Sequence, residues 1–316
     1  MMMSKKDQEL PDRLFDTEDM HGYTTFRALS PGAEKWIGRP IKCLDHGFVY
    51  LVDYMGNDES VVQAARTSYG QGTKKVSNTE VLIRHLRRHF HNTPFEMVEF
   101  KFHCKMPIFV ARQWIRHRTA SVNEYSGRYS EMEDEFYVPE PGVLKKQSQS
   151  NRQGRDEDLE QGQKFDILQG LRDCYQNQYD FYQRLLNNHE LARELARLPL
   201  SVGNYTQWYW KIDLHNLMHF LHLRLDEHAQ YEIRVFAQAM ARIVREAVPI
   251  CFQAFEDYQL NSLTLTGLEL GFLRLHADLF PAKKERAHQI ILDHFGNKRE
   301  AGEFIEKLVS LGMILD

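Results

Sequence analysis

This chain of 316 residues lacks the marks of a membrane protein and of a disulfide-stabilised protein. It has no run of eighteen apolar residues, and its start, MMMSKKDQELPDR, lacks the apolar stretch of a signal peptide. Its four cysteines lie far apart and form no CxxC pair: Cys43, Cys104, Cys174 and Cys251. Such spacing favours reduced thiols over a disulfide framework or a zinc site. We therefore expect a soluble, cytoplasmic protein with no membrane partner.

Glycine-rich loops that hold phosphates are also missing. The sequence contains neither GxGxxG nor GxxxxGK[ST], and it has no GxSxG nucleophile motif. Any bound phosphate must therefore be held by side chains. A basic excess is absent too, because 40 Lys and Arg stand against 44 Asp and Glu, a net charge of −4. This balance argues against a nucleic-acid partner.

The first half of the chain predicts strands and helices in turn. Apolar residues alternate with polar ones from Val98 to Met106, as in a strand with one buried face. Asn78 or Thr79 is suited to cap a helix whose apolar residues recur every three or four positions. In chain order we expect a strand over 47–54, helices over 58–68 and 79–90, the strand over 98–106, and a helix over 108–118.

The second half predicts mainly helices after a polar loop. The segment 142–163 is rich in Gln and Ser and is expected to be a loop. Helices are expected over 165–186, 189–198, 213–228, 231–257, 264–280, 281–296 and 298–312. Strands first and helices later indicate an α+β fold, with an antiparallel sheet and several long helices. We expect an N-terminal extension (1–40), one catalytic domain (41–258) and a C-terminal helical extension (259–316).

An unusual concentration of arginine lies between Arg112 and Arg128, in the run RQWIRHRTASVNEYSGR, which has no lysine. A guanidinium group grips a phosphate or carboxylate with two parallel donors, whereas an ammonium group is a point charge. Short polar residues accompany these cations: Ser121, Asn123, Glu124 and Ser126. The run therefore predicts a pocket for a planar, phosphorylated small molecule.

A second group of polar residues recurs along the helix expected over 213–228. His215, His219, His222 and Asp226 share one face, and Leu217, Leu221, Arg224 and His228 share the opposite one. Three interpretations are open. The histidines could bind a divalent metal, although the glutamate of an HExxH site is missing. They could form hydrogen bonds in a buried interface, which is the more frequent case, or they could line a ligand pocket.

The segment Arg116–Arg128, RHRTASVNEYSGR, resembles the signature of the flavin-dependent thymidylate synthases. Further similar segments are GFVYLVDYMGNDESVVQAARTSY, HNTPFE, FHCKMPIFVARQW and LHLRLDEHAQYEIR. The resemblance covers about residues 40–256. It implies a homotetramer of α+β fold that converts dUMP to dTMP in de novo dTMP biosynthesis. The methylene comes from 5,10-methylenetetrahydrofolate, and the reducing equivalents come from NADPH through bound FAD.

The resemblance also implies a set of site residues and no metal. The dUMP contacts fall on Gln113, Arg116, Glu124, Ser126, Gly127, Arg128, Arg197 and Arg224. The FAD contacts fall on Ser68, His91, Thr93, Arg116, His117, Arg118, Glu124, Asp213, His215 and His219. Some relatives carry Asn, Arg and Asn in place of the last three, so the flavin hydrogen bonds there are expected to differ in detail.

Arg224 and Ser126 are the predicted catalytic residues. Uracil must gain electron density at C5, and no cysteine is suitably placed to attack it. A fixed cation within about 4–6 Å of the uracil edge has the same effect by favouring the ionised base. Arg224 is the candidate for this cation, and Ser126 for a hydroxyl that orients the substrate. Arg224 and the pair His215 and His219 are expected to serve nucleotide and flavin from opposite helix faces.

Two other classes of function compete with this interpretation. One is a metal-dependent hydrolase that acts on a nucleotide through the histidine face. The other is a non-catalytic module that binds a nucleotide or RNA through the arginine cluster, with steep salt dependence. Metal content and turnover distinguish the three hypotheses.

Overall fold

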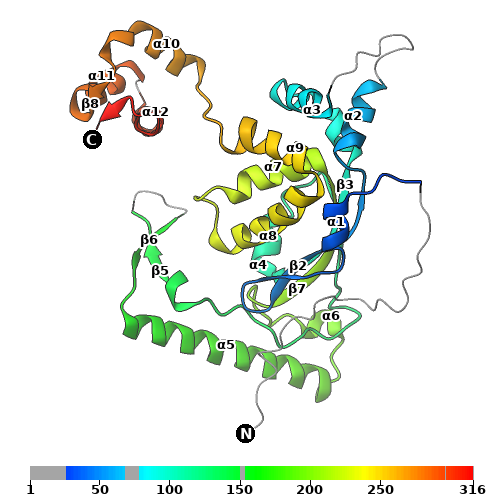
Figure 1. The fold of residues 1–316 in the computed structure, drawn as a ribbon. Coiled ribbons are helices and arrows are strands. Elements are labelled where there is room, and N and C mark those ends of the chain that lie inside the picture. Colours follow the sequence, from blue (N-terminus) through cyan, green and yellow to red (C-terminus); the bar gives the residue numbers. More distant parts are fainter. Residues whose placement is uncertain (1–25, 68–77, 150–153, 296, 316) are drawn as a thin grey trace. The chain divides into compact units, whose positions relative to one another are not determined.

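The computed structural model describes residues 26–67, 78–149, 154–295 and 297–315. The chain forms two compact units, one that ends at Leu260 and one that begins at Asn261. The first unit contains a mixed arrangement of helices around an antiparallel sheet (Figure 1). The predicted α+β fold with an antiparallel sheet is confirmed. Among the described helices, none has the length and apolarity that a membrane span requires.

The central sheet has five strands, each antiparallel to its neighbours, in the order β1-β2-β3-β7-β4. The strands are β1 (Ile41–Cys43), β2 (Gly47–Met55), β3 (Glu99–Pro107), β4 (Ser121–Glu124) and β7 (Tyr205–Asp213). In β3 the apolar side chains Phe100, Phe102, Cys104 and Met106 are buried, as the alternation predicts. The sheet therefore has one face in the core, and β4 lies at its edge.

Strand β7 was not anticipated from the sequence, although its pattern is clear. Trp208, Trp210 and Ile212 alternate along YTQWYWKID and are buried, while Tyr209 and Lys211 are exposed. This strand pairs with β3 along its whole length and with β4 on its other side. It therefore holds the arginine-rich segment against the sheet.

Five helices bring apolar side chains to the sheet and to one another: α1 (Pro31–Trp36), α4 (Ile108–Trp114), α7 (Leu214–Leu225), α8 (Tyr231–Ala247) and α9 (Pro249–Phe255). Figure 1 shows α7, α8 and α9 grouped together. Trp114 of α4 is fully buried and contacts the rings of Trp208, Trp210, Phe220 and Phe236. The helix expected over 231–257 is interrupted between α8 and α9, because Pro249 cannot donate the backbone hydrogen bond of a continuous helix.

Helices α2 (Asp58–Arg66) and α3 (Thr79–Arg88) are both slightly shorter than predicted. The carboxamide of Asn78 accepts a hydrogen bond from the Glu80 N–H at 3.0 Å, which confirms it as the cap of α3. The 3₁₀ turn η2 (Thr93–Met97) follows and leads into β3. A π-helical turn, η4 (Glu256–Leu260), ends the first unit.

Three expectations for the middle of the chain are wrong. Helix α4 ends at Trp114 and not at Arg118, because the chain must extend before β4 pairs with β7. The segment expected as a loop contains η3 (Pro141–Val143) and a hairpin of β5 (Lys145–Gln147) and β6 (Arg155–Asp158). The helix expected over 189–198 is one turn, α6 (Arg193–Ala196), which follows the long α5 (Gln161–Asn187).

The second unit has its own small core. Its elements are α10 (Gly267–Leu275), η5 (Ala277–Leu279), β8 (Ala282–Lys283), α11 (Lys284–Phe295), α12 (Lys298–Ser310) and β9 (Ile314–Leu315). The three predicted helices are therefore confirmed. Phe272 and Phe304 are fully buried and pack edge to face, with ring centroids 5.6 Å apart.

Candidate nucleotide and flavin site

A cavity of about 660 Å³ lies where the segment after α4, the end of β7 and helix α7 meet. Its described lining residues are Arg116, His117, Arg118, Thr119, Ile212, Asn216, His219, Leu223 and Arg224. Three are arginines, two are histidines and none is acidic. Several cations gathered without a carboxylate require an anionic partner. The cavity is therefore suited to a phosphorylated ligand or to an ionised base.

His117 and Arg224 are joined directly inside this cavity. The Arg224 Nε–H donates a hydrogen bond to His117 Nε2 at 3.1 Å. Burial, followed by the charge of Arg224 and the neighbouring His219, lowers the pKa of His117 to about 4. At neutral pH the imidazole is therefore uncharged and accepts through Nε2. This bond fixes the direction of the guanidinium group.

Asp213 occupies the junction between β7 and α7. Its Oδ1 accepts a hydrogen bond from the Asn216 N–H at 2.9 Å, and its Oδ2 accepts one from the Asn216 side chain at 2.8 Å. Asp213 is thus the N-cap of α7, and the first helical residue is Leu214. Asn216 is in turn held at the cavity wall.

His219 and Arg224, which are predicted to act from opposite faces of α7, both line the same cavity. They are five positions apart, so their directions differ by about 140°, and a wide cavity receives both. Asp226 lies just beyond the last helical residue of α7, and its charge raises the pKa of His222, which burial lowers. Its Oδ1 accepts a hydrogen bond from the His228 N–H at 2.8 Å.

The hypothesis of a metal on the histidine face gains no support from the described part of the chain. No three His, Cys, Asp or Glu side chains are gathered there as metal ligands. His215 and His222 instead have buried Nδ1 atoms without a hydrogen-bond partner. Within the described residues of one chain, these two atoms remain available to a ligand or to a partner subunit.

A second group of predicted residues lies beyond the other end of β4. Ser126 Oγ accepts a hydrogen bond from the Arg128 N–H at 3.3 Å. The Arg128 guanidinium forms an ion pair with Glu194 at 3.2 Å, and Arg197 Nε donates to the Glu194 carbonyl at 3.4 Å. A methyl group on Gly127 would lie 2.8 Å from the Met132 sulfur and 3.3 Å from Arg197 Cδ. Only glycine therefore fits between these side chains without a shift.

The two groups are separated along the edge strand. Arg118 precedes β4 and Ser126 follows it, and an extended chain advances about 3.3 Å per residue. The four residues of β4 alone therefore place roughly 10 Å of backbone between them. None of the residues from Ser126 to Arg128, nor Arg197, lines the arginine-rich cavity.

The remaining predicted residues occupy separate places. The buried Oε1 of Gln113 has no hydrogen-bond partner, and Glu124 Oε1 accepts a hydrogen bond from the Thr206 hydroxyl at 2.8 Å. Thr93 lines a different cavity, of about 560 Å³. The ring centroid of His91 lies 6.0 Å from that of His85. Ser68 lies outside the described residues.

Sequence reasoning missed four residues of the arginine-rich cavity: Thr119, Ile212, Asn216 and Leu223. Asn216 follows a capping aspartate by three residues, a spacing that signals a helix start. That signal would have placed Asn216 in the first turn of α7. No comparable signal marks the other three.

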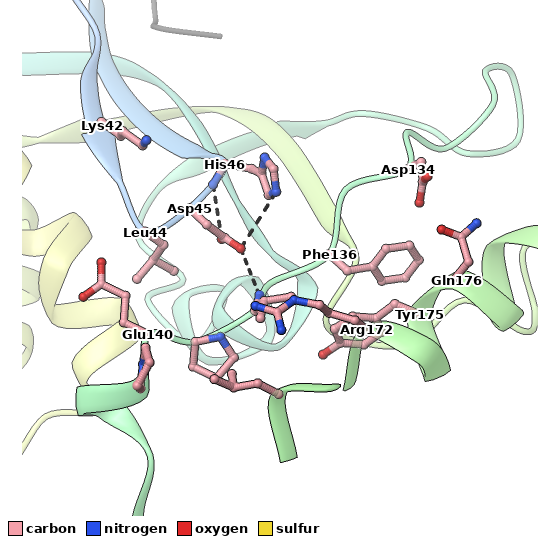
Figure 2. Close-up of a pocket in the computed structure, with 14 residues that line it drawn as sticks. Lys42, Leu44, Asp45, His46, Asp134, Phe136, Glu140, Arg172, Tyr175 and Gln176 are labelled. Atoms are coloured by element: carbon pink, nitrogen blue, oxygen red, sulfur yellow. Dashed lines mark hydrogen bonds and ion pairs between the residues drawn. The ribbon is translucent and has the colours of Figure 1, made fainter. Parts of the chain in front are cut away.

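A further cavity, of about 730 Å³, lies beside α5 and contains none of the predicted residues (Figure 2). Phe136 and Tyr175 stack there with ring centroids 4.7 Å apart. Asp45 accepts hydrogen bonds from the Val138 N–H at 2.9 Å and the His46 N–H at 3.2 Å. Cations and carboxylates line this cavity together, so it lacks the one-sided charge of the arginine-rich cavity.

The fold and the arginine-rich motif are those of one enzyme family. Residues 50–250 match the family described as "Thymidylate synthase complementing protein". Similar curated proteins are named flavin-dependent thymidylate synthase. That of Ruegeria pomeroyi is 52% identical over 82% of this chain and 87% of its own length. That of Gluconobacter oxydans is 56% identical over 79% of this chain and 83% of its own length. The chain belongs to this family, and the prediction of an enzyme of that family is confirmed.

Solved structures agree with this assignment. A UMP/dUMP methylase PolB from Streptomyces cacaoi, bound with 5-Br UMP, superimposes with a TM-score of 0.63 at 33% identity. The alignment covers 70% of this chain and 98% of that one. The same methylase bound with 5-Br dUMP gives a TM-score of 0.63 at 32% identity, over 70% and 99% of the two chains.

Proposed function

We propose that this protein is a flavin-dependent thymidylate synthase that reductively methylates dUMP to dTMP. The methylene comes from 5,10-methylenetetrahydrofolate, and NADPH supplies the reducing equivalents through bound FAD. The observation that carries the proposal is the cavity with Arg116, Arg118 and Arg224, which has no acidic residue in its described lining. The names of the relatives and the uridine nucleotides bound to the similar structures support the choice of substrate.

The chemistry of the donor set fits a flavin. His117, Arg118 and His219 bring aromatic and cationic groups to the cavity wall, and His215 adds a buried, unpartnered ring nitrogen beside it on α7. A dinucleotide cofactor combines a flat ring system with a diphosphate, which calls for such a mixture. Bound FAD would carry the hydride, and the protein would supply position and electrostatics. The remaining proposed flavin contacts are Ser68, His91, Thr93, Arg116, Glu124 and Asp213.

Arg224 is proposed to activate the nucleotide. Its guanidinium is held by neutral His117, and burial, followed by the charge of Arg116, lowers its pKa. A partly desolvated, fixed cation at the uracil edge stabilises the negative charge that develops there. This favours electron density at C5 without covalent attack by the protein.

The cysteines support this route. Cys43, Cys104 and Cys251 are buried, and burial raises the pKa of each thiol. A buried neutral thiol is a poor nucleophile. Cys174 is exposed on α5 and is not among the described residues that line the arginine-rich cavity. All four are free thiols, in keeping with a reducing cytoplasm.

The group after β4 is proposed to hold the rest of dUMP. Ser126, Gly127, Arg128 and Arg197 offer a hydroxyl, backbone space and two forked cations, which suit a phosphate group. Ser126 orients the substrate and is not an activated nucleophile, since its hydroxyl contacts the Arg128 N–H and no base. Gln113, Arg116 and Glu124 are proposed to contact the same nucleotide.

The placement of the two groups agrees with a site shared between subunits, which the resemblance implies. They lie at opposite ends of β4, and none of the residues from Ser126 to Arg128 lines the arginine-rich cavity of its own chain. We therefore propose a homotetramer in which Ser126–Arg128 of one copy faces the arginine-rich cavity of another.

The proposal is tested by measuring flavin absorbance and turnover of the purified protein in the absence of oxygen. Purified protein should be yellow, NADPH should bleach the flavin absorbance, and 5-tritiated dUMP should release tritium when folate is present. A colourless protein that refuses added FAD would contradict the proposal. Activity that depends on stoichiometric zinc or manganese would instead favour the hydrolase.

A further inference from the structure

Arg87, near the end of α3, is a buried cation without an anionic partner. Only 6% of its surface is exposed. Its Cζ lies 5.8 Å from the ring centroid of Phe95 and 5.9 Å from that of Phe255. Burial lowers the pKa of Arg87 to about 10, so the group stays charged at neutral pH. In the part of the chain that the structure describes, no carboxylate acts on it.

Stacking on two rings does not satisfy this side chain. A guanidinium group carries five N–H donors, and ring faces attract the charge without accepting most of those hydrogens. The nearby titratable group is Cys251, whose pKa is raised well above its ordinary value by burial, so it is a neutral thiol. A buried, unpaired charge destabilises the folded protein through lost hydration, and a bound anion offsets this loss.

Arg87 stacks on Phe95 of η2, and η2 packs against α7, which carries two imidazoles that the charge of Arg87 reaches. His215 and His222 stand seven positions apart on one face, and the Nδ1 atom of each is buried without a hydrogen-bond partner. Burial lowers the pKa of both, and the charge of Arg87 lowers each further.

The acidic residues near these imidazoles do not neutralise the cation. Asp213 and Glu96 raise the pKa of His215, and Asp226 raises that of His222. Asp213 is engaged as the cap of α7, and Asp226 is engaged with His228. None of the three acts on Arg87.

His219 connects this group to the arginine-rich cavity. It lies between His215 and His222 on α7, it lines the cavity, and its ring centroid is 6.0 Å from that of His117. Its proximity also lowers the pKa of both neighbouring histidines. The Arg87 group therefore adjoins the cavity proposed for flavin.

We propose that Arg87, His215 and His222 form an anion subsite that receives a phosphate group. A forked guanidinium group and two imidazole N–H groups offer more donors than one carboxylate can accept from. The oxygens of a phosphate group match this donor set better. Within the proposed function, on which this part rests, the phosphate belongs to the diphosphate of FAD. Free phosphate or diphosphate has the same chemistry and is the other source.

The test compares full-length flavin-free protein with its Arg87→Met variant. Methionine suits the apolar slot between Phe95 and Phe255, so the variant should fold with an unchanged or higher melting temperature. Loss of a charge-assisted contact should raise the Kd for FAD at least about tenfold. The Kd for riboflavin, which has no phosphate, should change less than about twofold. Both are measured by flavin fluorescence.

Arg88→Met is the matched control. Arg88 is exposed on the same helix, with Cζ 6.0 Å from the Tyr258 ring centroid. The control loses the same formal charge and should keep the FAD affinity of the wild type. Arg87→Lys retains the charge without the fork, so it should bind FAD with intermediate affinity.

Inorganic diphosphate distinguishes the two sources. A melting temperature that diphosphate raises in wild type but not in Arg87→Met, with equal FAD affinities, supports the subsite and assigns it to a free anion. If wild type binds no FAD, the proposed function fails, while the diphosphate response still decides the subsite. Equal responses of wild type and Arg87→Met to FAD, riboflavin and diphosphate overturn the proposal.

Discussion

At the scale of single residues, the account depends on which groups are charged inside the cavity. His117 is neutral at pH 7 because burial and the charge of Arg224 lower its pKa. A neutral His117 accepts the Arg224 N–H, whereas a protonated one would repel it. His117 of the RHR motif is therefore a hydrogen-bond acceptor in the folded protein.

This state of His117 predicts how stability depends on pH. The pKa falls from 6.5 to about 4 on folding, so between these values the unfolded chain binds a proton that the native chain does not. The stabilisation is present above pH 6.5 and is lost as the pH falls toward 4. Urea unfolding of wild type should show this loss, and His117→Asn should show a smaller one. Identical pH profiles would contradict the pKa assignment.

Gly127 gives a second prediction at this scale. In Gly127→Ala the new methyl group meets the Met132 sulfur at 2.8 Å and Arg197 Cδ at 3.3 Å. The variant should lose about 1–3 kcal/mol of unfolding free energy through overpacking, and its KM for dUMP should rise because Arg197 is displaced. Gly142→Ala is the control, since its methyl group meets nothing within 4 Å. Equal behaviour of the two variants would show that Gly127 is not constrained.

At the scale of elements, the junction of β7 and α7 decides where the cavity residues lie. The buried tryptophans of β7 fix the strand, and Asp213, its last residue, caps α7, which begins at Leu214. Ile212, Asn216 and His219 then follow from the strand and helix periods. Loss of the Asp213 cap should therefore displace the residues of α7 that line the cavity.

Asp213→Ala removes that cap. The loss of the bonds to the Asn216 N–H and side chain should cost about 1 kcal/mol of unfolding free energy. Flavin binding should weaken too, because Asn216, which lines the cavity, loses the hydrogen bonds that hold it in place. Asp213→Asn keeps the capping oxygen and should recover most of the stability. If the asparagine variant is as unstable as the alanine one, the capping explanation is wrong.

Much of the fold could be predicted at this scale, and the reasons for the errors are physical. Alternation identified β3, and Asn78 identified the start of α3, because both signals are local. The end of α4 at Trp114 depends on the pairing of β4 with β7, which is a long-range contact. Arg116 and Arg118 could be found as a contiguous motif, whereas Ile212 and Leu223 enter the cavity only through the tertiary packing of β7 and α7.

At the scale of the whole molecule, the chain divides into two units with separate cores. The match to the family ends at residue 250, and every residue of the proposed site precedes Leu260. The core of the first unit contains no residue beyond Leu260. All residues of the proposed site therefore belong to the first unit.

A chain that ends at Leu260 tests this separation. It should fold, bind FAD and retain turnover within about twofold of the full chain, since no described core residue of the first unit is lost. Circular dichroism, flavin absorbance and tritium release from dUMP provide the readouts. Loss of flavin binding in a folded, truncated protein would show that residues after Asn261 contribute to the site.

The Arg224 guanidinium is held by His117 within a cavity that has no acidic side chain among its described lining residues. The most direct test of its proposed role is the turnover of Arg224→Ala, with its flavin content recorded in the same preparation. The variant should keep its flavin and lose at least roughly 100-fold in kcat, as expected when a fixed cation is removed from a developing negative charge. Turnover close to that of the wild type, with flavin bound, would contradict the account.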